Sequence, residues 1–201
     1  MIKRLFDLTL SAVGLIASAP FWALFALAIK LEDGGAVFFP QERVGLGGRV
    51  FIALKFRSMI PDAESRSGAV QAGENDPRIT RVGRLLRGTA MDELPQLWNI
   101  FVGDMSFVGP RPLVPGEVEV RGDGRLIRLA DIPGYEARHG VRPGLTGLTQ
   151  VYAARDISRT SKFRLDRLYL QRAGLCLDLK LIALSFWITG RGAWESREPK
   201  V

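Results

Sequence analysis

An uncharged apolar run near the N-terminus constrains the fold of this chain more than any other feature. Residues 8–29 form a stretch of 22 residues without a charged side chain. As a straight α-helix this stretch would reach roughly 33 Å, enough to cross the hydrocarbon core of a bilayer. Pro20 lies within it, where a proline removes a backbone hydrogen bond at a cost of about 3 kcal/mol. The sequence therefore predicts a membrane helix with a weak point inside it.

Three interpretations of this run compete. Lys3 and Arg4, the apolar stretch and Ala17-Ser18-Ala19 resemble a signal peptide with its cleavage site. A second apolar run at residues 21–31 continues beyond that site and argues against cleavage. The other two interpretations are a single helix that spans the bilayer and a re-entrant helix. The re-entrant helix would enter the membrane, bend at Ser18–Pro20 and leave on the same side.

The charges that flank the run bear on this choice. Lys3 and Arg4 precede it, and Lys30 and Arg43 follow it. Because positive residues mark the cytoplasmic side of a membrane segment, cations at both ends favour a helix whose two ends lie on that side. The Ser18 hydroxyl could also bond a carbonyl that the proline frees, which would ease either form. The residues alone leave the spanning and re-entrant forms about equal.

Charge and the rare residue types narrow the chemistry. Lys and Arg outnumber Asp and Glu by 28 to 21, and the pI is about 10.1, which suits an anionic membrane, a nucleic acid or a phosphorylated substrate. Cys176 is the one cysteine, so an internal disulfide is excluded. His139 is the one histidine, which excludes a zinc site built from several histidines. Catalysis must therefore rest mainly on Asp, Glu, Lys and Arg.

Local patterns predict an α+β fold that is mostly helical, with a membrane segment over residues 1–32 and one integrated domain over residues 33–201. Residues 36–44 and 49–56 read as strands around a glycine-rich turn and predict a small β-hairpin. Amphipathic helices are expected at 78–87 and 158–172, a helix of mixed charge at 113–129, and an interfacial or core helix at 175–188. Loops are expected at 61–77, 102–115 and 138–149.

Two adjacent acids mark the most informative polar segment. Asp92 and Glu93 precede Pro95, and proline is tolerated only in the first turn of a helix. We therefore expect Asp92 to be the N-cap of a helix that runs towards Gly103, where the helix dipole favours its ionised form. The alternative is that Thr89 caps this helix and Asp92 completes a capping box. Either way, the acids lie where a helix begins.

Arg111 raises a functional interpretation of this pair. It lies between Pro110 and Pro112, which restrict its backbone. A guanidinium binds phosphate with two hydrogen bonds, and its five N–H donors suit a diphosphate. An ionised aspartate could ligate Mg²⁺ or attack phosphorus directly. The pattern indicates phosphate chemistry.

Four segments resemble the motifs of the monotopic phosphoglycosyl transferases, also called the bacterial sugar transferase family. They are Phe-Arg-Ser-Met at 56–59, Met-Asp-Glu-Leu-Pro-Gln-Leu-Trp-Asn at 91–99, Gly-Asp-Met-Ser-Phe-Val-Gly-Pro-Arg-Pro at 103–112 and Arg-Pro-Gly-Leu-Thr-Gly at 142–147. The two central motifs are the most specific, and the resemblance runs from the N-terminal helix to about residue 180. The chain has about the length of a minimal catalytic member, without the extra membrane helices of larger relatives.

The resemblance implies a re-entrant helix broken at Ser18–Pro20 in the bacterial inner membrane, with the catalytic domain on the cytoplasmic face. It also implies transfer of a sugar-1-phosphate from a UDP-sugar to undecaprenyl phosphate, with release of UMP, as the first membrane step of glycoconjugate biosynthesis. In that ping-pong scheme Asp92 attacks the sugar-linked phosphorus, and the lipid phosphate then displaces it. Mg²⁺ on Asp92 would neutralise the diphosphate, and Glu93 would assist the metal site or the lipid step.

The resemblance also extends to other charged residues. It implies substrate binding by Lys55, Arg87, Arg111, Arg142 and Arg155. Asp166 and Asp178 match as well and are expected to be structural. The family usually carries Asn-Gly-Arg after Gln-Val, whereas here Gln150-Val151 leads to Tyr152-Ala153-Ala154-Arg155. The loop that carries Arg155 therefore departs from the family pattern.

The expected partners are a UDP-sugar, undecaprenyl phosphate and membrane lipids, and a homodimer is compatible with the sequence. No nucleic acid is expected, because the chain has no recognisable DNA- or RNA-binding motif. The expected donor carries an acetamido sugar, as in UDP-diacetylbacillosamine or a UDP-HexNAc, with galactose and glucose left open. Two alternatives remain. One is a membrane-anchored basic binding protein that depends on Arg78, Arg81 and Arg84, and the other is a Mg²⁺-dependent lipid-diphosphate hydrolase that needs no second lipid substrate.

Overall fold

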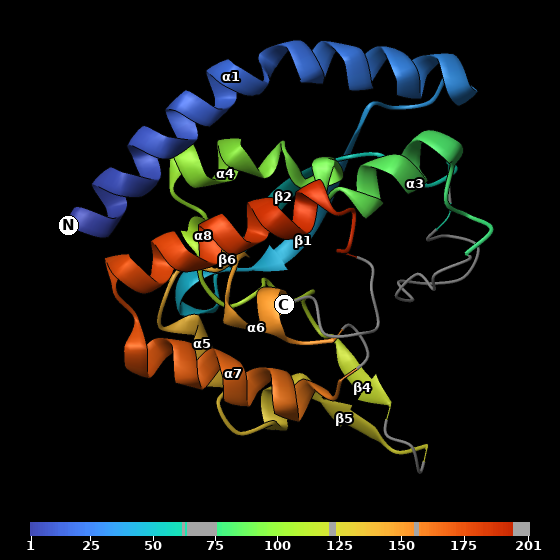
Figure 1. Cartoon of the computed structure of the whole chain (residues 1–201). Coiled ribbons are helices and arrows are strands. Elements are labelled where there is room, and N and C mark those ends of the chain that lie inside the picture. The colour runs from blue at the N-terminus through green and yellow to red at the C-terminus, as the bar shows by residue number, and fades with distance from the viewer. Residues whose placement is uncertain (62, 64–75, 121–123, 155–156, 195–201) are drawn as a thin grey trace.

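Helix α1 (Ile2–Asp33) arches over the rest of the chain in the computed structural model (Figure 1). The structure describes residues 1–61, 63, 76–120, 124–154 and 157–194. Asp7, Ser11, Ser18 and Ile29 are the buried residues of α1, and their spacing places them on one face of the helix. Apolar side chains such as Ile16 and Leu31, each 77% exposed, cover its other sides. Among the described residues, α1 is the one helix long and apolar enough to cross a membrane.

Pro20 lies inside α1 without interrupting it. Helical structure continues from Ile2 to Asp33, and the helix is curved in Figure 1. The helix is therefore not interrupted at Ser18–Pro20, where a break was predicted. A single proline removes one backbone bond and can be accommodated by bending. The Ser18 hydroxyl donates to the Leu15 carbonyl at 3.4 Å and accepts from the Trp22 indole at 3.1 Å. It therefore bonds the carbonyl beside the one that the proline frees.

Both ends of α1 are held by polar contacts with the same body of the protein. Near the start, the Arg4 guanidinium donates to the Ile100 and Phe101 carbonyls at 2.6 and 2.7 Å. Near the end, Glu32 accepts the Arg81 backbone N–H at 2.6 Å, and Asp33 forms an ion pair with Arg57. The helix is therefore fastened to the domain at each end.

The predicted hairpin is confirmed. Strands β1 (Phe38–Val44) and β2 (Val50–Phe56) pair antiparallel, with Val44 opposite Val50. A 3₁₀ turn, η1 (Leu46–Gly48), joins them. Its Gly47 and Gly48 have φ angles of 64° and 78°, which side chains with a Cβ rarely adopt. The glycines in the turn thus set the register of the hairpin.

The segment around the acids differs from the expectation in its boundaries. Helix α3 (Arg81–Gly88) begins after Thr80, whose hydroxyl caps it by accepting from the Gly83 N–H. Arg78 precedes the helix and pairs with Asp76, so the helix predicted over 78–87 starts too early. The cap at Thr80 explains the later start.

Asp92 is not a helix N-cap. It lies in a 3₁₀ turn, η2 (Met91–Glu93), and helix α4 (Gln96–Val102) follows with Pro95 as its N-cap. The Thr89 alternative is also wrong, because the Thr89 hydroxyl donates to the Leu85 and Leu86 carbonyls at the end of α3. The predicted end of α4 is confirmed, with Gly103 in the left-handed conformation.

Two short strands lie within residues 113–129, where a helix was expected. Strands β4 (Val118–Val120) and β5 (Leu126–Arg128) pair antiparallel. The expected loops at 102–115 and 138–149 contain β3 (Ser106–Val108) and β6 (Gly144–Thr146), which pair in parallel. Short elements surround them: η3 (Leu129–Asp131), α5 (Tyr135–His139) and α6 (Leu148–Tyr152).

The two C-terminal helices are confirmed. Helix α7 (Arg159–Arg172) is capped by the Ser158 hydroxyl, and α8 (Leu175–Gly190) follows. Leu181 and Ile188 of α8 pack in a buried cluster with Tyr169 of α7, while Phe186 and Trp187 of α8 are exposed. Helix α8 thus contributes to the core on one side and presents large apolar side chains on the other.

Candidate active site

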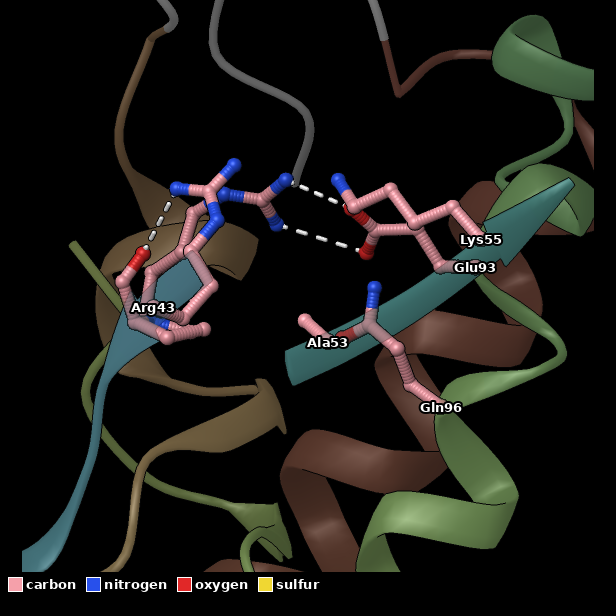
Figure 2. Close-up of a pocket in the computed structure, with 7 residues that line it drawn as sticks. Arg43, Ala53, Lys55, Glu93 and Gln96 are labelled. Carbon is pink, nitrogen blue, oxygen red and sulfur yellow. Dashed lines mark hydrogen bonds and ion pairs between the residues drawn. The ribbon is translucent and has the colours of Figure 1, made fainter. Parts of the chain in front are cut away.

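Three elements bring an acid and two cations together. Lys55 projects from β2, Glu93 from η2 and Arg111 from the loop after β3, and Figure 2 shows Lys55 and Glu93 on one side of the pocket. The Lys55 Nζ lies 2.9 Å from the Glu93 Oε1, and the Arg111 Nη2 lies 2.6 Å from the same oxygen. The Glu93 side chain is only 11% exposed. Glu93 is therefore a nearly buried carboxylate bridging two cations.

Backbone strain orients the acid pair. Ala90, immediately before η2, has a φ of 55° and is the one non-glycine residue of the described chain with a positive φ. Such a conformation costs free energy and persists where the surroundings enforce it, commonly at functional sites. It turns the chain sharply between α3 and η2, and so places Asp92 and Glu93 next to β2.

The two acids are electrostatically different. Burial alone would raise the pKa of Glu93, but the adjacent Arg111 and Lys55 cations outweigh it and lower that pKa well below its usual range. Burial, followed by the negative charge of Glu93, raises the pKa of Asp92 to about 6, against the opposing effect of Lys55, Arg87 and Arg111. Burial also lowers the pKa of Lys55. Glu93 is thus firmly ionised, whereas Asp92 ionises more readily once another cation joins it.

Asp92 is also free to react. It is half-buried, and no hydrogen bond or ion pair holds its carboxylate within the part of the chain that the structure describes. Arg87, in the last turn of α3, contributes positive charge to its surroundings. The structure therefore brings four predicted residues of this pair and its cations together: Asp92, Glu93, Lys55 and Arg111, with Arg87 beside Asp92.

A buried network of hydrogen bonds holds the backbone of Arg111 in place. The Arg138 guanidinium donates to the Arg111 carbonyl at 2.6 Å and to the Asp166 carboxylate at 3.0 Å. The side chains of Arg138 and Asp166 are each 3% exposed, and the Thr149 hydroxyl donates to Asp166 at 2.6 Å. Asp178 has a comparable place between α1 and α8, where it pairs with Lys3 and accepts from the Tyr169 hydroxyl. The carboxylates of Asp166 and Asp178 are therefore both bound by other side chains of the protein.

Two predicted binding residues do not join this cluster. The Arg142 Nε donates to the Gly103 carbonyl at 2.7 Å. Its side chain lines a separate open hollow of about 570 Å³, together with Arg49 and Asp104. Arg155 lies outside the residues that the structure describes.

Arg43 and Gln96 were not predicted as site residues, yet they line the same pocket as Lys55, Glu93 and Arg111 (Figure 2). The period of the strands could have revealed Arg43. In the observed register Arg43 pairs with Phe51, and Lys55 pairs with Phe39. Residues two apart along a strand share a face, so Arg43 and Lys55 project from the same face of the hairpin.

The residues fit a magnesium ion only if substrate oxygens complete its coordination. Asp92 offers a carboxylate that no other described group binds, whereas Glu93 is bound by Lys55 and Arg111. In the described chain no three His, Cys, Asp or Glu side chains gather into a metal cage. Mg²⁺ commonly binds one or two carboxylates together with phosphate oxygens and water. Asp92 can supply the first of these ligands.

The structure thus combines a long apolar surface helix with a pocket in which cations surround Glu93, next to Asp92. The comparison with known sequences makes this specific. The profile of the family described as "Bacterial sugar transferase" matches residues 1–192, and the chain belongs to that family.

Several curated proteins are similar to the chain. It is 44% identical over 188 residues to the undecaprenyl-phosphate glucose phosphotransferase of Komagataeibacter xylinus, a match that covers 91% of this chain and 35% of that protein. It is 41% identical over 187 residues to the exopolysaccharide production protein PSS of Rhizobium leguminosarum bv. phaseoli, covering 90% and 92%. It is 43% identical over 185 residues to the UDP-glucose:undecaprenyl-phosphate glucose-1-phosphate transferase of Caulobacter vibrioides, covering 90% and 66%. The chain thus spans about a third of the first relative, nearly all of the second and about two thirds of the third.

Proposed function

We propose that this protein transfers a sugar-1-phosphate from a UDP-sugar to undecaprenyl phosphate and releases UMP. The observation that carries the proposal is the contrast within the acid pair. Glu93 is neutralised by Lys55 and Arg111, whereas the adjacent Asp92 is half-buried and without a bonded partner among the described residues. A free carboxylate beside several cations suits attack on a phosphate. The printed names of the relatives from Komagataeibacter xylinus and Caulobacter vibrioides support this substrate pair.

The proposed reaction has two half-reactions. An oxygen of Asp92 attacks the sugar-linked phosphorus, and the bond from that phosphorus to the UMP oxygen breaks with its electron pair leaving on UMP. An oxygen of undecaprenyl phosphate then attacks the same phosphorus, and Asp92 leaves as a carboxylate. Lys55, Arg87 and Arg111 offset the negative charge of the phosphates in both steps. The protein therefore works by a ping-pong scheme with a covalent aspartyl-phosphosugar.

Glu93 and a metal have supporting roles in this proposal. Glu93 holds the Lys55 ammonium and the Arg111 guanidinium in the pocket, so both cations are positioned before an anionic substrate arrives. Mg²⁺, held by Asp92 and by phosphate oxygens, would neutralise the diphosphate. Its charge would also favour the ionised form of Asp92 over the protonated form that burial favours.

The printed names of two relatives support glucose as the donor sugar. Two of the relatives described above carry glucose in their printed names. We therefore place UDP-glucose ahead of the acetamido sugars expected from the sequence. The relative named as an exopolysaccharide production protein supports a product that enters polysaccharide biosynthesis.

We further propose that α1 is a re-entrant anchor that keeps the domain on the cytoplasmic face of the inner membrane. Arg4 fastens the start of α1 to α4, and Asp33 fastens its end to Arg57 beside β2. Because both contacts are to the same domain, a straight span would have to break one of them. The exposed apolar side chains of α1 supply the surface that would enter lipid.

Cysteine labelling tests this topology. Ile2→Cys and Lys30→Cys, each in a Cys176→Ser background, mark the two ends of α1, and Arg128→Cys marks the domain. We expect a membrane-impermeant maleimide to label all three in inverted vesicles and none in right-side-out vesicles, because both ends of a re-entrant helix share the side of the domain. Labelling of Ile2→Cys from the side opposite to Arg128→Cys would contradict the re-entrant form.

The substrate test uses the purified chain in detergent or nanodiscs with Mg²⁺. We expect UMP release from UDP-glucose that requires undecaprenyl phosphate for turnover, and slower release from UDP-N-acetylglucosamine and UDP-galactose. Release of inorganic phosphate from a lipid diphosphate, with no UMP formed from any UDP-sugar, would favour the hydrolase alternative. Activity that is unaffected by chelation of Mg²⁺ would remove the metal from the proposal.

A further inference from the structure

Arg43 is a cation in the active-site pocket that forms no ion pair with an acid of the described residues. Its Nη1 donates to the Pro112 carbonyl at 3.1 Å, and its Nη2 donates to the Gln41 side chain. Both acceptors are neutral, and no carboxylate of the described chain lies within ion-pair distance of Arg43. By contrast, Arg138, a buried arginine near the site, has Asp166 as its ion-pair partner. A half-buried guanidinium left with neutral acceptors is poised for an anion.

The pocket carries an excess of positive charge. It is lined by three cations (Arg43, Lys55 and Arg111) and by one anion, Glu93. Figure 2 shows Arg43 entering from one side and Lys55 with Glu93 from the other. Burial, and then the like charge of Arg111, lowers the pKa of Arg43 to about 10. A bound phosphate would offset this excess and relieve the repulsion between the two arginines.

Arg43 lies across the pocket from the acid pair. Figure 2 shows Arg43 opposite Glu93, the residue that follows Asp92 in the chain. Among the described residues, Arg43, Lys55, Glu93 and Arg111 line the pocket, whereas Asp92 does not. A phosphate held beside Asp92 and a phosphate held beside Arg43 would therefore occupy different places.

We propose that Arg43 binds the UMP phosphate of the donor, the phosphate that leaves when Asp92 attacks. This inference rests on the proposed function. Phosphoryl transfer places the attacking and leaving oxygens roughly in line on opposite sides of phosphorus. With Asp92 as the attacking group, the leaving oxygen faces the far end of the pocket, where Arg43 lies. As the bond to UMP breaks, negative charge grows on that oxygen, and a guanidinium stabilises it there.

The test separates the two half-reactions. Arg43→Gln removes the positive charge but keeps N–H donors for the Pro112 carbonyl. Arg43→Lys keeps the charge. Arg128→Gln is the control, because Arg128 is an exposed arginine that pairs with Asp131. With donor alone, we expect Arg43→Gln to form the phosphosugar adduct about 10²- to 10³-fold more slowly than wild type. We expect about 10- to 100-fold weaker binding of UMP. Arg43→Lys should recover part of both losses, and Arg128→Gln should match wild type.

Discharge of preformed adduct distinguishes the role of Arg43 from that of the lipid site. Adduct on the Arg43→Gln variant should pass to undecaprenyl phosphate within about threefold of the wild-type rate, since UMP has already left. An equal loss in adduct formation and in discharge would overturn the assignment, and so would unchanged UMP binding. If wild type forms no adduct, the proposed function fails, and UMP binding still decides whether Arg43 holds this phosphate. Thermal unfolding of each variant checks that it folds, and Arg43→Lys replaces Arg43→Gln if the latter does not.

Discussion

Asp92→Asn is expected to abolish turnover, with a loss of at least about 10³-fold in UMP release and no phosphosugar adduct by mass spectrometry. An amide has nearly the same shape as the carboxylate but cannot attack phosphorus. Since the Asp92 carboxylate makes no hydrogen bond with the described residues, the substitution breaks no contact of the fold. The loss should therefore be one of chemistry alone.

The same variant should unfold at a temperature equal to or above that of wild type. Burial and the charge of Glu93 raise the pKa of Asp92 in the folded protein. A carboxyl group with a raised folded pKa destabilises the fold at any pH above its unfolded pKa, because it must ionise against that resistance. A neutral amide removes this penalty at neutral pH. A destabilised active site of this kind is commonly retained because activity needs it.

Glu93→Gln is the matched comparison. It leaves Lys55 and Arg111 without the carboxylate that bridges them, so it should lower both activity and the unfolding temperature. The two neighbouring acids are thus expected to separate by their effect on stability. Full turnover of Asp92→Asn with donor and undecaprenyl phosphate, or an adduct on another residue, would end the proposal of an aspartyl intermediate.

Asp166→Ala is expected to cost about 3–5 kcal/mol in the free energy of unfolding, because it leaves Arg138 as an unpaired buried charge. The Arg138–Asp166 pair is 3% exposed on each side, and Arg138 also donates to the Arg111 carbonyl. Loss of this anchor should loosen the loop that carries Arg111. Urea or thermal unfolding in detergent measures the first effect, and UMP affinity measures the second.

Two comparisons sharpen that prediction. Asp131→Ala breaks the exposed pair with Arg128 and should cost less than about 1 kcal/mol. The double variant Arg138→Met with Asp166→Leu replaces both charges by apolar groups and should recover much of the stability. It should not recover UMP affinity, because the hydrogen bond to the Arg111 carbonyl stays absent. Equal costs for Asp166→Ala and Asp131→Ala would show that the buried pair contributes little.

Local patterns were sufficient for the parts of the fold that depend on neighbours in sequence. The apolar run of α1, the glycine turn between β1 and β2 and the helices α7 and α8 were all expected near their observed bounds. The prediction of a helix at 113–129 was wrong because strands of three residues are too short to give a clear periodic signal. Their strand conformation depends on the pairing between β4 and β5. The predicted start of a helix at residue 78 was wrong because the Thr80 side chain caps α3. This cap outweighs the regular spacing of the arginines from which the start was predicted.

The sequence by itself determined the family motifs, the acid pair and most of the cations that surround it. It could not show that Asp92 and Glu93 differ in their contacts and ionisation, because these depend on which carboxylate Lys55 and Arg111 reach. The strand period puts Arg43 and Lys55 on one face of the hairpin, but the pocket that they line is formed only in the tertiary structure. These contacts join residues far apart in the chain, and burial sets the ionisation of the acids. Only the tertiary structure decides which charges lie next to the nearly buried Glu93, and charge interactions there are strong enough to separate the two acids.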